Sequence, residues 1–260
     1  MEAEAPLQTW KDRARGLLDG LGGEPAIVIY AGSALLIVSH YQGSAGFWRS
    51  LVGARFDTHP WAGALGYLWW FGSSFVLYLV MPLVVSFATK GRFHERYGFQ
   101  WGDWKEGLKI SALFLAVMLP ATYVASKLDS FKGIYPLAGN SAFMENLGGG
   151  KTSVSWKLFL VYEAGYMAYF FAWEFLFRGW MVNGLVPKWG RAQAILVQVM
   201  PFAVMHLGKA ELEALGSIVA GVALGILAVR TRSFFYGFFL HGAVAFWMDW
   251  LSVHDKLLNA

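Results

Sequence analysis

The stretch Tyr169-Phe170-Phe171-Ala172-Trp173-Glu174-Phe175-Leu176-Phe177-Arg178-Gly179 places a carboxylate and a guanidinium inside a run that is otherwise apolar and aromatic. Glu174 and Arg178 are four positions apart, so on a helix they share one face, one turn from each other. Ionisable groups inside a membrane segment are costly, so they usually face the protein interior and mark function. The stretch therefore predicts a membrane helix that carries a buried polar site.

The composition of the whole chain also indicates a membrane protein. Of its 260 residues, 57% are hydrophobic, 17% aromatic and 15% charged, whereas a soluble domain has about 25% charged residues. The absence of Cys excludes disulfides, thiolate metal sites and cysteine nucleophiles. The net charge of +4 is typical of basic cytoplasmic loops rather than of nucleic-acid binding.

We expect an all-α, polytopic integral membrane bundle with about seven transmembrane helices. Residues 1–24 are predicted to be a polar cytoplasmic lead-in, and residues 25–255 a single transmembrane bundle. The distribution of Lys and Arg favours a multi-pass protein of the cell membrane with a cytoplasmic N-terminus. The expected spans cover residues 26–42, 62–88, 110–125, 156–182, 192–207, 212–229 and 234–251.

Two further patterns concern the sixth span and the connector between the third and fourth spans. Ser217, Gly221 and Gly225 recur every four residues in the sixth span, which predicts close packing against a neighbouring helix. Residues 127–154 form the longest polar connector, and its Gly148-Gly149-Gly150 run indicates flexibility.

Six ionisable residues fall inside the fourth, fifth and seventh spans. Glu163 lies three helical turns before Glu174, and Asp249 lies eight residues after His241, so each pair shares a helix face. At 1.5 Å per residue, the depths of four of them, Glu174, His206, His241 and Asp249, allow these groups to meet in one intramembrane cavity. The six residues are Glu163, Glu174, Arg178, His206, His241 and Asp249.

The residue types suggest hydrolysis of a peptide bond. We expect Glu174 to act as a general base towards water, with Arg178 holding the carboxylate in place. His206 and His241 can position the water or donate hydrogen bonds to a developing oxyanion. Asp249 and Glu163 are supporting candidates.

Three motifs in the second half of the chain resemble the CPBP (CAAX protease and bacteriocin-processing, or Abi) intramembrane proteases, which include the type II CAAX prenyl endopeptidases. The family pattern has Glu-Glu-x-x-x-Arg in one helix, Phe-x-x-x-His in the next and His-x-x-x-Asn/Asp/Ser in a later one. Here the motifs read Trp173-Glu174-Phe175-Leu176-Phe177-Arg178, Phe202-Ala203-Val204-Met205-His206 and His241-Gly242-Ala243-Val244-Ala245, with Arg230-Thr231-Arg232-Ser233 similar to the usual lead-in to the last.

The resemblance covers about residues 155–250 and implies a glutamate-dependent membrane endopeptidase. Such an enzyme activates water with a carboxylate, needs no cofactor, and cleaves a membrane-associated polypeptide. Trp173 stands where the family has its first Glu, and Ala245 where it has an Asn-like residue. Asp249, one turn beyond Ala245, is a candidate for the missing polar group.

Other interpretations remain open at this stage. Glu174 and Arg178 can be a structural ion pair, and the two His residues can be core residues with satisfied hydrogen bonds. A zinc site is a weaker alternative, because the His-Glu-x-x-His pattern is absent. The departures at Trp173 and Ala245 also fit a catalytically inactive scaffold or immunity protein. A transporter is disfavoured by the lack of recognisable inverted repeats.

Overall fold

The computed structural model describes residue 10 and residues 22–87, 93–139, 142–148 and 151–258. The fold is all-α apart from one small hairpin, as the sequence predicts. Most of the expected lead-in lies outside the described residues, as do residues 88–92 at the end of the second expected span, and Gly149 and Gly150.

The first half of the chain forms two long helical segments, several short helices and one peripheral long helix. The second segment runs through a π-helical stretch, η2, just before Pro82. The elements are α2 (Gly23–Gln42), α3 (Ala45–Val52), η1 (Gly53–Arg55), α4 (Ala62–Phe75), η2 (Val76–Val80), α5 (Met81–Phe87), α6 (Phe93–Tyr97), α7 (Trp104–Ala125) and α8 (Asp129–Lys132).

The second half begins with a hairpin and continues as four long helical segments. α9 passes directly into a second π-helical stretch, η4, and α10 is kinked at Gly190, whose φ is 77°. The elements are β1 (Met144–Gly148), β2 (Lys151–Val154), α9 (Trp156–Glu174), η4 (Phe175–Asn183), α10 (Gly184–Val204), α11 (Glu211–Thr231) and α12 (Phe235–Leu258).

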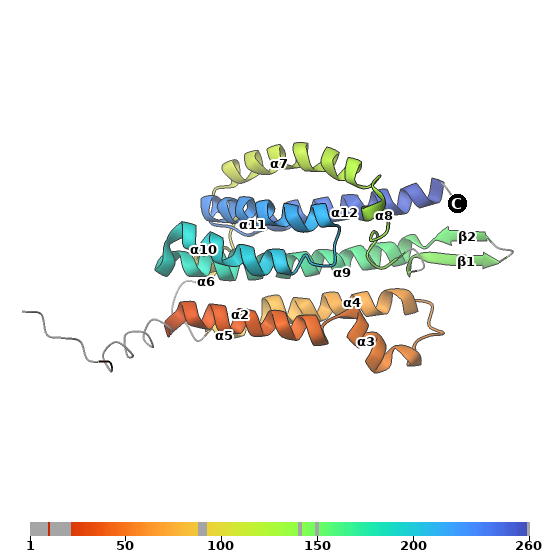
Figure 1. Cartoon of the computed structure of the whole chain (residues 1–260), viewed down its shortest axis with the longest axis horizontal. Helices are drawn as coiled ribbons and strands as arrows, with labels where there is room; N and C mark the ends of the chain where they lie inside the picture. The colour runs from red at the N-terminus through yellow and green to blue at the C-terminus, as the bar shows by residue number, and fades with distance from the viewer. Residues whose placement is uncertain (1–9, 11–21, 88–92, 140–141, 149–150, 259–260) are drawn as a thin grey trace, which may run out of the picture.

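The hairpin lies in the connector that sequence patterns predict only as polar and flexible. β1 and β2 pair antiparallel, with Met144 opposite Val154 and Glu145 opposite Ser153. The hairpin projects from one end of the bundle, beside the start of α9 (Figure 1). The two strands are short and pair with each other locally, so the sequence has no long apolar period that would predict them.

The helices form a layered bundle with α9 and η4 in its middle (Figure 1). α4 packs on α9 from one side, and α12 packs on α9 from the other. α10 packs on α11, while α7 covers α11 and α12. The central position of η4 explains its composition, because every residue from Phe175 to Val182 is buried.

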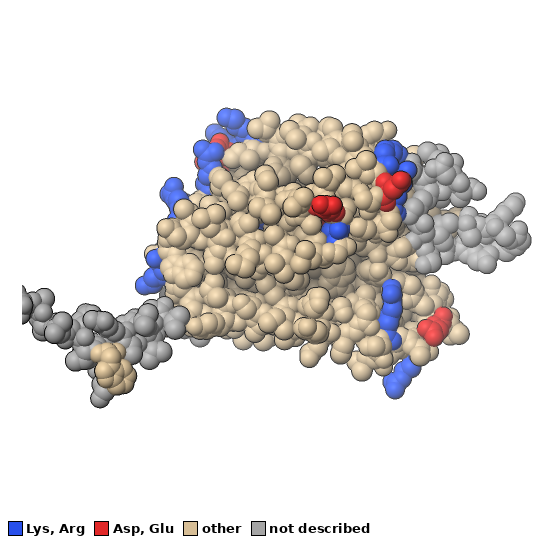
Figure 2. Space-filling view, viewed as in Figure 1, with Lys and Arg blue, Asp and Glu red and all other residues tan. Residues whose placement is uncertain are grey.

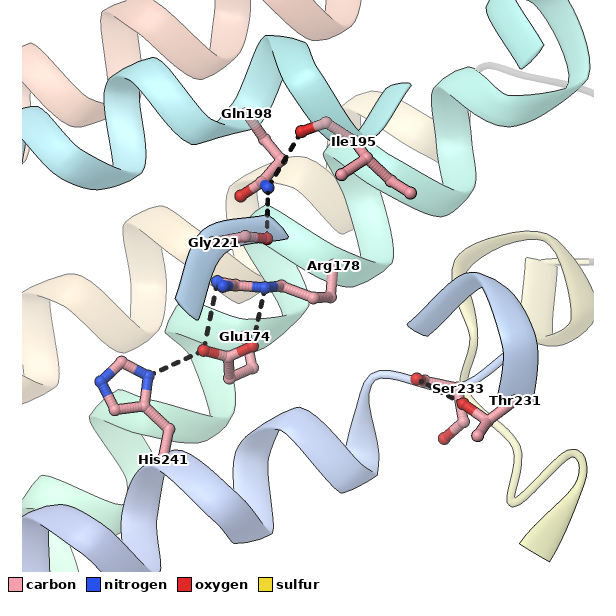
Figure 3. Close-up of polar contacts among 8 residues, drawn as sticks. All are labelled: Glu174, Arg178, Ile195, Gln198, Gly221, Thr231, Ser233 and His241. Atoms are coloured by element: carbon pink, nitrogen blue, oxygen red, sulfur yellow. Dashed lines mark hydrogen bonds and ion pairs between the residues drawn. The ribbon is translucent and has the colours of Figure 1, made fainter. Parts of the chain in front are cut away.

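Small residues bring the helices around the site close together. A Cβ at Gly225 would lie 3.0 Å from Ile195 Cγ2, and one at Gly221 would lie 3.3 Å from Phe202 Cδ1. The Gln198 amide fixes the same contact, since its Nε2 donates to the Ile195 and Gly221 carbonyls at 3.0 and 2.9 Å (Figure 3). The predicted close packing of α11 is therefore against α10.

The surface fits a bilayer. Most of the visible face is free of Lys, Arg, Asp and Glu apart from one small group near its middle, and the other charged side chains gather towards the two ends (Figure 2). Among the described residues, four segments are long and apolar enough to cross a membrane: α2, residues 62–87, α7 and α11.

The other three expected spans are also helical, in α9, α10 and α12, but they are not among these four segments. Their polar, Tyr and Trp residues lower their hydropathy, and many of these side chains face the bundle interior. The count of seven spans is thus supported for four helices and stays a prediction for three.

Candidate functional site

Glu174 and Arg178 form a fully buried ion pair at the junction of α9 and η4. Arg178 Nη1 lies 3.2 Å from Glu174 Oε1, and Nε lies 3.2 Å from Oε2 (Figure 3). Both side chains have 0% exposure. This two-point contact fixes the orientation of the carboxylate, because a guanidinium presents a planar fork of donors.

His241 connects this ion pair to α12. Its Nδ1 lies 2.8 Å from Glu174 Oε1, and its side chain is 20% exposed (Figure 3). An ionised carboxylate can only accept, so Nδ1 is the protonated nitrogen and donates. Glu174 thereby sets the tautomer of His241 and leaves Nε2 as the second functional nitrogen.

Glycine at position 237 allows this arrangement. A Cβ there would lie 2.7 Å from Glu174 Oε2. The backbone of α12 therefore closes over the carboxylate on the side that Arg178 and His241 leave open. Glu174 is the buried anchor of the group, and His241 is its more exposed member.

His206 faces His241 from the turn after α10. The two rings are nearly parallel, with centroids 6.3 Å apart and planes 13° apart. His206 Nδ1 lies 2.7 Å from the Phe202 carbonyl oxygen. A carbonyl cannot donate, so Nδ1 carries the proton and Nε2 is an acceptor.

Phe202 contacts both halves of the group. Its ring centroid lies 4.1 Å from Arg178 Cζ and 4.6 Å from the ring centroid of His206. The ring of His241 is 6.1 Å away. Phe202 thus supports the ion pair with its ring and orients His206 with its carbonyl. The Phe-x-x-x-His motif marks Phe202, but its spacing alone does not predict this double contact.

The two departures from the family motifs have visible structural consequences. Trp173 is buried, and its indole meets the His206 ring edge-on at 5.9 Å between centroids. An aromatic ring therefore lies beside His206 on the helix position where the family pattern has a carboxylate. Ala245 packs as a partly buried apolar residue against the main core.

Glu163 and Asp249 lie together, but away from Glu174. Both are buried, and their carboxyls interact with each other across α9 and α12. Glu163 precedes Glu174 by eleven residues, or about 16 Å along the helix. Asp249 follows His241 by eight residues, or about 12 Å. The structure thus brings together Glu174, Arg178, His206 and His241, while the supporting role expected of Glu163 and Asp249 stays a prediction.

Sequence reasoning missed three polar residues near Glu163 and Asp249. Tyr135 Oη donates to Glu213 at 2.6 and 2.7 Å from its two oxygens, and Lys209 Nζ donates to Tyr135 Oη at 3.1 Å. In the sequence, Lys209 and Glu213 are typical of an ordinary solvated turn. The sequence contains one signal for them, because Lys209 and Glu213 are four residues apart and follow His206 closely. Tyr135 is 78 residues from Glu213, so no local pattern connects the two.

Burial and neighbouring charges shift the pKa values of Tyr135 and Lys209, which lie in connections between helices. Burial raises the pKa of Tyr135 well above its usual value, and the Glu213 carboxylate adds to the effect, so the hydroxyl remains a donor. Burial lowers the pKa of Lys209, whereas Glu213 and Asp249 act in the opposite direction. We call Glu163, Asp249, Lys209, Glu213 and Tyr135 the second polar cluster.

The turn before α12 is held by its own hydroxyls. Thr231 Oγ1 donates to Leu227 O at 2.8 Å. The same hydroxyl approaches Ser233 O at 3.3 Å (Figure 3). Gly102, with a φ of 52°, lies directly against the Thr231 carbonyl, where a Cβ would not fit. This turn fixes the start of α12 and hence the placement of His241.

Metal ligation was the weaker alternative from the sequence. Within the described ranges, no group of three or more His, Cys, Asp or Glu side chains could hold a metal ion. The expectation that the protein needs no cofactor stays a prediction.

The site thus combines a buried carboxylate, a guanidinium and two imidazoles inside a helical bundle. Residues 155–247 match the family model described as type II CAAX prenyl endopeptidase Rce1-like. This part of the chain is therefore similar to that protease family, in agreement with the motif resemblance. The match begins just before α9 and ends within α12, so it contains Glu174, Arg178, His206 and His241. No curated protein and no solved structure matches the chain.

Proposed function

We propose that the protein is a membrane-embedded endopeptidase that hydrolyses peptide bonds of a membrane-associated polypeptide. The observation that carries the proposal is the 2.8 Å contact between Glu174 Oε1 and His241 Nδ1, with His206 facing His241. A carboxylate on Nδ1 raises the basicity of the other nitrogen and stabilises the imidazolium that forms during reaction.

The contacts favour a division of roles that differs from the sequence-based expectation of Glu174 as base. Glu174 has 0% exposure, and Arg178, His241 and the backbone at Gly237 surround its oxygens. Water reaches the more exposed His241 more readily. In this proposal Glu174 and Arg178 are positioning residues, and His241 is the general base.

The proposed reaction balances its protons within this group. A water between the two rings donates one hydrogen bond to His206 Nε2 and gives a proton to His241 Nε2. The resulting hydroxide attacks the substrate carbonyl carbon. His241 Nε2 then returns its proton to the leaving amine as the carbon–nitrogen bond breaks. The imidazolium, paired with Glu174, also stabilises the oxyanion until that transfer.

The proposal also includes the environment and the orientation of the protein. The bilayer is the environment of both enzyme and substrate, and no nucleic acid takes part. The protein is a multi-pass protein of the cell membrane with its N-terminus in the cytoplasm. The chemistry needs no metal, so we expect cleavage to continue in EDTA.

Cleavage can be tested with an assay that surveys all membrane proteins at once. Membranes of cells that express the full chain are compared by mass spectrometry of protein N-termini with membranes that contain Glu174→Gln or His206→Ala. New N-termini are expected with the native chain and should be lost in both variants. His40→Ala is the matched control, because His40 is an exposed residue in the last turn of α2. Full cleavage by both site variants would contradict the proposal.

A second candidate function rests on Trp173. Its indole lies against His206, where the family pattern has a carboxylate. This favours a non-catalytic scaffold or immunity protein that retains the fold of the family. It predicts that the native chain yields no new N-termini in the same experiment, while surface substitutions abolish partner binding.

A further inference from the structure

The second polar cluster is not enclosed on all sides. Lys209 and Glu213, on the connection from α10 to α11 and the first turn of α11, have side chains that are 19% and 26% exposed. Figure 2 shows the small group of charged side chains near the middle of the visible face, in the region where Figure 1 places this connection. The cluster therefore reaches the flank of the bundle, away from both charged ends.

The cluster contains more acidic than basic groups. It contains three carboxyls, those of Glu163, Glu213 and Asp249, and one ammonium, that of Lys209. Lys209 is engaged with the outer members, 3.1 Å from Tyr135 Oη and 3.9 Å from Glu213 Oε1. Glu213 is also the acceptor for Tyr135. The inner carboxyls adjoin each other, and Lys209 acts on Asp249 through its charge rather than through a hydrogen bond.

Within the part of the chain that the structure describes, the inner members interact with each other but have no well-formed hydrogen bond to another group. Asp249 has 0% exposure and Glu163 has 4%. Among the described residues, none of their four carboxyl oxygens has a partner of good hydrogen-bond geometry. The buried hydroxyl of Tyr162, which interacts electrostatically with both carboxyls, also has none. Burying such groups is costly unless a donor or a cation completes them.

The geometry points to a subsite that binds one basic side chain of the polypeptide substrate, a guanidinium or an ammonium, between Glu163 and Asp249. This inference rests on the proposed peptidase function and deepens it. Lys209, Glu213 and Tyr135 form the entrance, through which the cation passes from the flank of the bundle. A guanidinium supplies several N–H donors, which suits two adjacent carboxyls that have none.

The position of the subsite sets a spacing in the substrate. The carboxyls lie about 12–16 Å along α9 and α12 from Glu174 and His241. An extended peptide covers about 3.3 Å per residue. The basic residue is therefore expected about four residues from the bond that is cleaved, on the side that lies towards the hairpin end of the bundle.

Binding can be measured separately from cleavage. The full chain in lipid nanodiscs is titrated into a short, fluorescent apolar peptide that contains one Arg, and into the same peptide with citrulline in its place. Fluorescence anisotropy should give a Kd about tenfold lower for the Arg peptide, as a charge-assisted contact predicts. Citrulline keeps the shape of Arg and removes only its charge.

Two substitutions should shift this preference in opposite directions. Asp249→Asn removes one carboxylate and should bring the ratio of the two Kd values close to one. Lys209→Met removes the cluster's own cation and should raise the ratio. Misfolding cannot produce an increase, so the pair keeps the test informative. Glu211→Gln, a change of an exposed acid at the start of α11, should leave the ratio unchanged.

The outcomes separate the subsite from the peptidase. Equal Kd values for both peptides on the native chain would overturn the inference, and so would a preference that Asp249→Asn leaves intact. Either result would indicate that Glu163 and Asp249 share a proton with each other and bind no cation. Glu174→Gln should abolish cleavage while the Arg preference persists. A clear preference in a chain that cleaves nothing would refute the proposed function and leave the binding site standing.

Discussion

At the residue scale, the site depends on one buried carboxylate whose neighbours determine what it can do. Glu174 accepts from Arg178 and His241, and the backbone at Gly237 closes its remaining side. The sequence predicted the membership of this group, because Glu174, Arg178 and both His residues stand out in apolar spans. The sequence could not predict which atoms contact each other, because this depends on the side-chain rotamers and on how closely α12 packs against α9.

Gly237→Ala should displace the carboxylate without removing any functional group. Its Cβ would lie 2.7 Å from Glu174 Oε2, so the carboxylate or α12 must shift. Displacement of a positioned group by about 1 Å can reduce the rate about 100-fold. Quantitative mass spectrometry of cleavage products measures the effect, and Gly216→Ala, which meets nothing within 4 Å, is the control. Equal rates in the two variants would argue against the placement of Glu174.

Phe202→Leu should weaken both the ion pair and the orientation of His206. The ring lies 4.1 Å from Arg178 Cζ in a buried setting, where a cation–π contact contributes about 2 kcal/mol. We expect a lower melting temperature and a fall in kcat with little change in KM, because Phe202 does not touch substrate in this proposal. Phe239→Leu, a change of a half-exposed ring, should leave both values near those of the native chain.

At the element scale, the sequence predicted the helices better than their interruptions. The Ser217, Gly221 and Gly225 pattern predicted the close packing of α11, and the contacts with Ile195 and Phe202 now identify α10 as its partner. The two π-helical stretches and the hairpin were not predicted. Both π-helical stretches continue an apolar helix without a break in period, and the hairpin forms by local pairing in a polar connector.

Gly225→Val should disrupt the packing of α10 on α11. Its Cβ would lie 3.0 Å from Ile195 Cγ2 and 3.3 Å from Ile195 Cγ1, and such overpacking costs about 1–3 kcal/mol. Thermal unfolding in detergent should show a clear decrease in melting temperature. Gly216→Val has the same change in helix propensity on the same helix, but it faces open space, so it should be nearly neutral. A similar loss in both variants would count against this interface.

At the scale of the whole molecule, composition predicted a helical membrane protein. The motifs predicted the similarity to the protease family, which the match over residues 155–247 supports. Sequence patterns did not predict that the connection from α10 to α11 reaches the flank of the bundle, between the two charged ends. This depends on how far each helix extends along the bundle, which span lengths alone do not determine. The second polar cluster follows from that placement.

The orientation in the membrane can be tested because the chain has no Cys. A single Cys replacing exposed Arg55, near the α3 end of the bundle, should react with a membrane-impermeant maleimide in intact cells. A Cys that replaces exposed Lys188, near the opposite end, should react only after lysis. The reverse pattern would place the N-terminus outside, contrary to the distribution of Lys and Arg.

The central claim is that Glu174 acts on the reaction through His241. A double-mutant cycle on substrate cleavage tests it most directly, with Glu174→Gln, His241→Ala and the double variant assayed in the same nanodisc preparation. Residues that act as a unit have strongly non-additive effects. We predict that the double variant cleaves no more slowly than His241→Ala alone. If the loss of cleavage rate in the double variant equals the product of the two single losses, the claim is contradicted. Glu174 would then have an independent role, such as that of the general base.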